Sequence, residues 1–131
     1  MTLARSNAHA EVWGDWYTLD DSNITGVWTP ATGVHSKNSF KYRKSQSAVV
    51  ISGDVFIPDG TPVGYLDIGV LHELPSRATN AYATIIYATS SGVDSGFSRL
   101  DRSGKLSLWF NSTPKATDCW AMLNVTSDLA G

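Results

Sequence analysis

The side chains that could do chemistry are few and widely spaced. His9, His35 and His72 lie far apart, and no two have the spacing of a metal-binding pair. The stretch GVDSG (92–96) contains a serine but lacks the Gly-x-Ser-x-Gly spacing of a hydrolase nucleophile. Cys119 is the only cysteine, so it has no disulfide partner in the chain, and neither neighbour would activate its thiol. We therefore expect no catalytic residue, no metal site and no cofactor.

The acidic residues supply two weaker candidates. The stretch DDSNITG (20–26) resembles the first half of a calcium-binding loop, but Thr32 stands where such a loop needs a bidentate glutamate, so we expect a polar turn. Two pairs could supply the two carboxylates of a glycoside hydrolase: Asp67 with Glu73, and Asp94 with Asp101. No sequence feature brings either pair together, which leaves a carbohydrate-active enzyme as a minor alternative.

The composition describes one domain with little charge and many aromatic rings. A chain of 131 residues suits a single domain. Ten Lys and Arg against twelve Asp and Glu give a net charge of −2, so we expect no binding of nucleic acid. No apolar stretch approaches the ~20 residues of a membrane span, so we expect synthesis in a cytoplasm without membrane insertion. Five Trp, five Tyr and four Phe exceed the needs of one small core, so some rings should line an interface.

Apolar alternation predicts that the elements which position these residues are β-strands. We expect strands at 48–57, 63–71, 80–90 and 119–127, with the nearly continuous run 80–90 buried on both faces. Residues 96–111 should form a hairpin around Arg102-Ser103-Gly104, with the glycine in the left-handed conformation. In this hairpin Trp109 should point away from the core-facing Leu106, Leu108 and Phe110. Residues 1–12 show no period and suggest an anchoring arm, followed by one domain over 13–131.

Several short features recur in an order that resembles a known family. They are Trp16, Tyr42-Arg43-Lys44, the strand from Val49 to Gly53, Leu74-Pro75, Arg99-Leu100-Asp101 with Gly104 and Leu106, and Trp120 to Leu123. Together they span nearly the whole chain, and their order resembles the C-terminal head domain of tailed-phage receptor-binding and tail-fibre proteins. The loop after Leu74-Pro75 departs from the family pattern, because SRATNAY replaces the usual Gly/Tyr-Arg-Pro.

The resemblance implies an all-β fold, an antiparallel jelly-roll-like β-sandwich that assembles as a homotrimer. It also implies a place on the virion surface, where the head binds host cell-surface saccharide and the N-terminal arm contacts phage capsid or tail proteins. Trp109, Trp28 and Tyr65 are the candidate rings for stacking on sugar, although each could instead be a subunit contact. The absence of a shaft sequence favours an alternative, a capsid decoration (cement) protein with the same trimeric fold. In either case Tyr42-Arg43-Lys44 should begin a strand, with its ring toward the core and its cations at the rim.

Overall fold

The computed structural model describes residues 12–19, 28–31, 40–72 and 80–128, and these residues form strands without any helix. The strands are β1 (Tyr17–Thr18), β2 (Trp28–Pro30), β3 (Lys41–Lys44), β4 (Ala48–Ile57), β5 (Gly64–Leu71), β6 (Ala81–Thr89), β7 (Gly92–Leu100), β8 (Lys105–Phe110) and β9 (Cys119–Asp128). The predicted all-β class is confirmed, as are the four strands and the hairpin.

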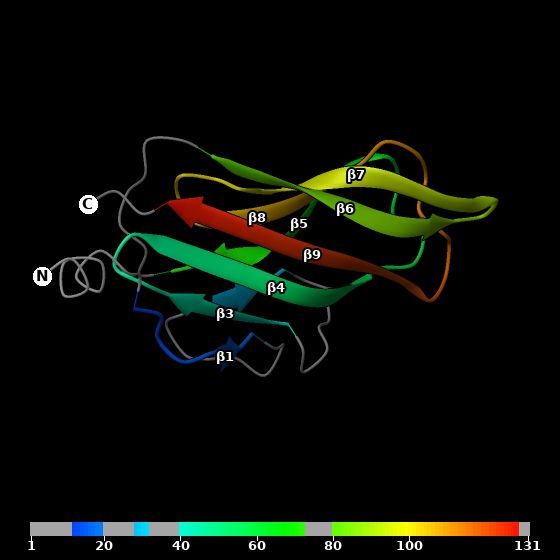
Figure 1. Ribbon diagram of the computed structural model, residues 1–131. Coiled ribbons are helices and arrows are strands. Elements are labelled where there is room, and N and C mark those ends of the chain that lie inside the picture. Colours follow the sequence, from blue (N-terminus) through cyan, green and yellow to red (C-terminus); the bar gives the residue numbers. More distant parts are fainter. Residues whose placement is uncertain (1–11, 20–27, 32–39, 73–79, 129–131) are drawn as a thin grey trace, which may run out of the picture.

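All nine strands belong to one curled antiparallel sheet, in the order β1-β3-β4-β9-β6-β7-β8-β5-β2. The longest pairing joins β4 and β9, with ten residues of each strand in register from Ala48↔Asp128 to Ile57↔Cys119. In Figure 1, β4, β9 and β6 lie in front of β5 and β8. The last strand of the order, β2, approaches the start of β3 near the other end: Trp28 packs edge-on against Phe40, the residue before β3, with ring centroids 5.7 Å apart.

The core fills the concave side of this curled sheet. In β4 the residues at every second position, Val49, Ile51, Val55 and Ile57, are buried. They meet Ala121, Leu123 and Val125 from the same face of β9, as alternation predicts. From the other side of the curl come Leu106, Leu108 and Phe110 of β8, all fully buried.

The expectation that β6 is buried on both faces is wrong. Ile85 and Tyr87 are buried, but Tyr82 and Ile86 are 58% and 60% exposed. A single curled antiparallel sheet covers the core with one face only, so the opposite face of β6 remains at the surface among the described residues. The apolar run in this strand therefore combines core residues with surface residues.

The turn between β7 and β8 forms as predicted. Gly104 has φ 95°, and its backbone N–H donates to the Asp101 carbonyl oxygen at 3.1 Å. The Asp101 carboxylate accepts further hydrogen bonds from Ser103 and from the backbone of Lys105. This network fixes the backbone of the turn, which places the exposed Arg102 at its tip.

The Tyr42-Arg43-Lys44 phrase lies in β3 and has the predicted orientation. Tyr42 is buried, whereas the Arg43 guanidinium points outward and stacks on Trp13 at 4.8 Å and on Trp16 at 4.5 Å. The chain just before β1 is also bound to β3 by a hydrogen bond from Gly14 N to Lys44 O of 2.8 Å. The aromatic and basic residues of this region thus hold the first strand on the sheet.

Several expectations concern residues outside the described ranges: the arm up to residue 11, the DDSNITG stretch, Leu74-Pro75 and two of the histidines. Within the described ranges, no three His, Cys, Asp or Glu side chains are grouped so that they could hold a metal ion. No helix in the same ranges has the length and apolar character to cross a membrane. The one cysteine, Cys119, is buried, and burial raises the pKa of its thiol.

Candidate functional site

Four aromatic side chains form a continuous row on the outer face of the sheet. They are Tyr65 of β5, Trp109 of β8, Phe97 of β7 and Tyr82 of β6, which we call the aromatic row. Backbone register explains their proximity, because Trp109 is the direct cross-strand partner of both Tyr65 and Phe97. Alternation explains their shared face, since the residues next to them in β8, Leu108 and Phe110, point into the core.

The rings of the aromatic row contact one another in sequence. The centroids of Tyr65 and Trp109 are 4.7 Å apart with the rings tilted edge-on, and Trp109 lies nearly parallel to Phe97 at 6.0 Å. Phe97 then meets the edge of Tyr82 at 5.7 Å. The two tyrosines at the ends of the row are the exposed members, at 50% for Tyr65 and 58% for Tyr82. The row therefore presents aromatic surface to solvent at both ends.

Hydrogen bonds hold the central indole in place. Trp109 Nε1 donates to Asn111 Oδ1 at 2.9 Å, and the Asn111 amide in turn donates to the carbonyl of Ser95 in β7. Because its only polar atom is already satisfied, Trp109 can offer a ligand ring surface but no further hydrogen bond.

Arg99 of β7 lies across one end of the row. Its guanidinium carbon is 4.4 Å from the centroid of the Tyr65 ring, and Nη1 donates to the Tyr65 hydroxyl at 3.4 Å. Its Nε atom is buried and has no hydrogen-bond partner. The stack fixes the arginine in position while most of its hydrogen-bonding capacity remains unused.

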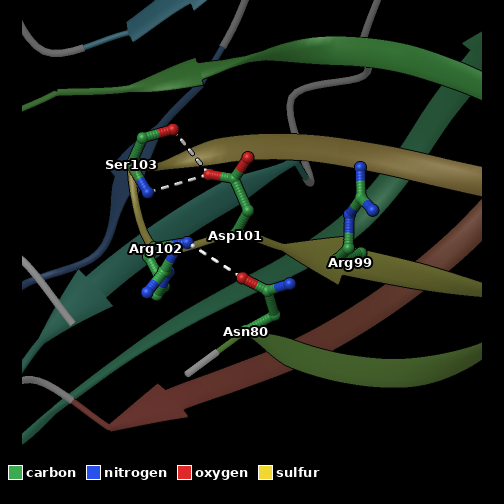
Figure 2. A pocket seen from close by; sticks show the side chains of 5 residues that line it. All are labelled: Asn80, Arg99, Asp101, Arg102 and Ser103. Atoms are coloured by element: carbon green, nitrogen blue, oxygen red, sulfur yellow. Dashed lines mark hydrogen bonds between the residues drawn. The ribbon is translucent and has the colours of Figure 1, made fainter. Parts of the chain in front are cut away.

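A polar hollow of about 310 Å³ opens beside the row, and Figure 2 shows the side chains that line it. These are Asn80, Arg99, Asp101, Arg102 and Ser103, which we call the arginine hollow. Asn80 precedes β6, Arg99 is near the end of β7, and the other three belong to the β7–β8 turn. The hollow thus depends on the hairpin turn and on the adjoining strand β6.

Two residues join the arginine hollow to the aromatic row. The Asn80 Oδ1 atom accepts from the backbone N–H of Arg102 at 3.2 Å, while its Nδ2 donates to the hydroxyl of Tyr82 at 3.3 Å. Arg99 lines the hollow and also stacks on Tyr65. The row and the hollow therefore form one surface, with ring faces on one side and polar groups on the other.

The described residues that line the arginine hollow carry an excess of positive charge. Among them are two cations, Arg99 and Arg102, and one anion, Asp101, which leaves one surplus positive charge within this part of the chain. Burial raises the pKa of Asp101, but hydrogen bonds from Ser103 and the Lys105 backbone outweigh that effect and hold the pKa below its usual value. Asp101 is therefore ionised near neutral pH, and its Oδ1 accepts hydrogen bonds from the turn.

Of the three candidate rings from the sequence, two are neighbours in the structure and the third is buried. Trp109 and Tyr65 are neighbours in the aromatic row. Trp28 is only 2% exposed, so its assignment as a ring for stacking on sugar is wrong. The reason is long-range packing: Phe40 lies against the indole, and Gly69 of the adjacent strand leaves the space that the indole fills.

Sequence reasoning missed most of the remaining site. Tyr82 and Phe97 complete the row, and Asn80, Arg99 and Arg102 supply the polar groups. The signal for Tyr82 was present, because alternation places it on the same face of β6 as Ile86, opposite the core residues Ile85 and Tyr87. That signal becomes readable only when β6 is recognised as exposed on one side.

Asp94, the possible glycoside-hydrolase partner of Asp101, lies near the start of β7, away from the arginine hollow. It accepts a short hydrogen bond from Ser112 Oγ, and the hydroxyl of the buried Tyr87 lies 3.4 Å from the same oxygen. Hydrogen bonding by Ser112 is the main reason why the pKa of Asp94 lies below its usual value. Seven residues of extended chain separate Asp94 from Asp101, or roughly 20 Å, whereas glycoside hydrolysis needs about 5–9.5 Å between carboxylates. The two do not form that pair.

Comparison with known proteins adds no relative. No protein-family model matches the sequence, and no curated protein matches it significantly.

Proposed function

We propose that this protein is a virion-surface structural protein of a tailed bacteriophage and that it binds host cell-surface saccharide during adsorption. The observation that carries the binding activity is the exposed aromatic row joined to the arginine hollow. The C–H faces of a sugar ring stack on aromatic side chains, and its hydroxyl groups need hydrogen-bond donors and acceptors close by. Both requirements are met on one face of the sheet. The place on a virion rests on the ordered sequence features that resemble tailed-phage heads.

The finer architecture belongs to the same proposal: a jelly-roll-like sandwich that assembles as a homotrimer, with the N-terminal arm attached to other phage proteins. Support for assembly comes from three exposed apolar side chains, Ile86, Met122 and Val93, which are 60%, 66% and 71% exposed. Ile86 and Met122 are direct partners across β6 and β9. Apolar groups gathered in this way suit a protein contact. Three linked copies would also raise a weak single-site affinity for saccharide by avidity.

A capsid decoration protein is the second candidate, and the same apolar side chains favour it. If Ile86 and Met122 contact a capsid surface rather than a sister subunit, the chain would serve the phage shell and would need no saccharide. The aromatic row favours the first proposal, because exposed rings beside polar groups suit stacking on sugar.

The test is binding of the purified protein to host envelope fractions and to a glycan array, with two variants. Tyr82→Ala removes an exposed ring of the aromatic row, whereas Tyr17→Ala removes a similarly exposed tyrosine from β1 as a matched control. Loss of one stacking contact should cost about 1 kcal/mol, or roughly fivefold in affinity at each site. We expect Tyr82→Ala to weaken binding and Tyr17→Ala to leave it unchanged. Wild-type protein that ignores every envelope fraction and every glycan would refute the saccharide function.

A further inference from the structure

We propose that the arginine hollow binds the carboxylate of a hexuronic acid while the sugar ring stacks on the Tyr82 end of the aromatic row. This inference rests on the proposed saccharide function and adds the chemical class of the sugar. The juxtaposition that carries it is a surplus of guanidinium charge in a polar hollow directly beside an exposed ring.

The arginines in the hollow are available to an anion. Among the described residues Arg102 makes no ion pair, and its side chain is exposed at the tip of the β7–β8 turn. Arg99 stacks on Tyr65 and donates from Nη1 to the Tyr65 hydroxyl; its Nε is buried, so the remaining Nη donors are the ones that an anion would contact. Guanidinium groups suit a carboxylate, because their N–H donors match the spacing of its two oxygens.

Neighbouring charges do not remove this capacity. Asp101 is the acidic residue of the described lining, and its Oδ1 atom already accepts from Ser103 N, Ser103 Oγ and Lys105 N at 2.7–3.0 Å. The nearby Lys105 ammonium pairs with Asp67 at 3.1 Å. The charge of Asp101 acts on Arg99, so among the described residues the surplus positive charge of the hollow lies mainly with Arg102.

The shape suits one charged sugar residue. The hollow, at about 310 Å³, lies at the lower end of the roughly 300–1,000 Å³ typical of small-ligand pockets. A hexuronic acid carries its carboxylate on a ring carbon, beside the ring rather than above it. A ring stacked on Tyr82 can therefore direct its carboxylate sideways, toward the hollow that Asn80 joins to the Tyr82 hydroxyl.

The experiment compares acidic and neutral members of matched sugar pairs by NMR titration of the isotope-labelled full chain at neutral pH. The probes are galacturonate with galactose, glucuronate with glucose, and the methyl ester of galacturonate as an uncharged control of similar size. Arg102→Gln removes one hollow cation without shortening the side chain by much. Lys115→Gln removes an exposed cation from the loop before β9 and serves as the control.

We expect at least one acid to bind about tenfold more tightly than its neutral partners, because a charge-assisted hydrogen bond is roughly twice as strong as a neutral one. Arg102→Gln should abolish that preference while leaving the affinity for the neutral sugar unchanged, and Lys115→Gln should keep it. The preference should also fall as ionic strength rises.

The outcomes separate this inference from the function on which it rests. If acidic and neutral sugars bind equally and Tyr82→Ala weakens both, saccharide binding stands and the assignment of a carboxylate is overturned. A preference for glucose 6-phosphate over both hexuronates would also overturn the carboxylate. If no sugar binds and host envelope fractions are ignored as well, both the inference and the saccharide function fail.

Discussion

Gly104 and Gly60 both have positive φ angles, and replacing each by alanine should cost very different amounts of stability. Gly104 has φ 95° and is buried, and a Cβ built there would overlap the carbonyl oxygen of Leu71 in β5. Gly60 has φ 77° and is exposed, and a Cβ there would meet no heavy atom within 4 Å. The two positions therefore share a conformational penalty, but only Gly104 adds a steric one.

The magnitudes follow from these two terms. Forcing an L-residue into the left-handed region costs about 1–2 kcal/mol at either site. At Gly104 the backbone of Leu71 must also move, and overpacking of this kind costs about 1–3 kcal/mol. The hydrogen bond from Leu71 N to Gly104 O, 2.9 Å long, would weaken as well, at a cost of up to about 1 kcal/mol. We expect Gly104→Ala to lower the free energy of unfolding by about 2–6 kcal/mol and Gly60→Ala by about 1–2 kcal/mol.

Equilibrium unfolding in urea, followed by tryptophan fluorescence, measures both losses. The slope of the free energy against urea should be the same for both variants and the wild type, which would show that the extent of unfolding has not changed. Equal losses at the two positions would refute the reasoning, because they would mean that the approach of Gly104 to Leu71 imposes no steric limit.

Three further predictions concern other parts of the fold. Tyr87→Phe keeps the buried ring but removes the hydroxyl that accepts from the Ser112 N–H at 3.0 Å. It should lower the free energy of unfolding, measured in urea, by about 1–2 kcal/mol. An unchanged free energy would contradict a stabilising role of this hydrogen bond. Because the folded-state pKa of Asp94 lies below the usual 3.8, its stabilising contribution should be complete above that pH and lost as the pH falls through the folded value. Unfolding measured from pH 6 to pH 2 should therefore show a weaker acid dependence in Asp94→Asn than in the wild type, and identical curves would argue against it. Sedimentation of the wild type at micromolar concentration should show a homotrimer that Ile86→Glu dissociates; a wild-type monomer would overturn the trimer.

Much of the strand content could be predicted from local pattern. In β4 and β9, apolar residues at every second position face the core in the structure, because successive side chains of an extended chain point to opposite sides. The same rule correctly placed Trp109 on the face opposite Leu108. Gly104 was predictable too, because a tight hairpin turn needs a residue that tolerates positive φ.

What the local pattern could not determine was which strands become neighbours. Tyr65 and Trp109 lie 44 positions apart in the chain, yet they are cross-strand partners because β5 pairs with β8. Trp28 is a large ring in a three-residue strand, and nothing close to it in sequence shows that Phe40 and Gly69 enclose it.

The sequence by itself therefore determined the longer strands, the inward faces of β4, β8 and β9, and the hairpin turn, since each depends on residues within a few positions of one another. The tertiary structure decided the burial of Trp28, the exposure of one face of β6, and the meeting of the aromatic row with the arginine hollow. These features depend on how the whole sheet curls. The curl of the sheet reflects a balance between the burial of apolar surface and the chain entropy lost when distant segments come together. Neither quantity can be calculated from a local window of residues.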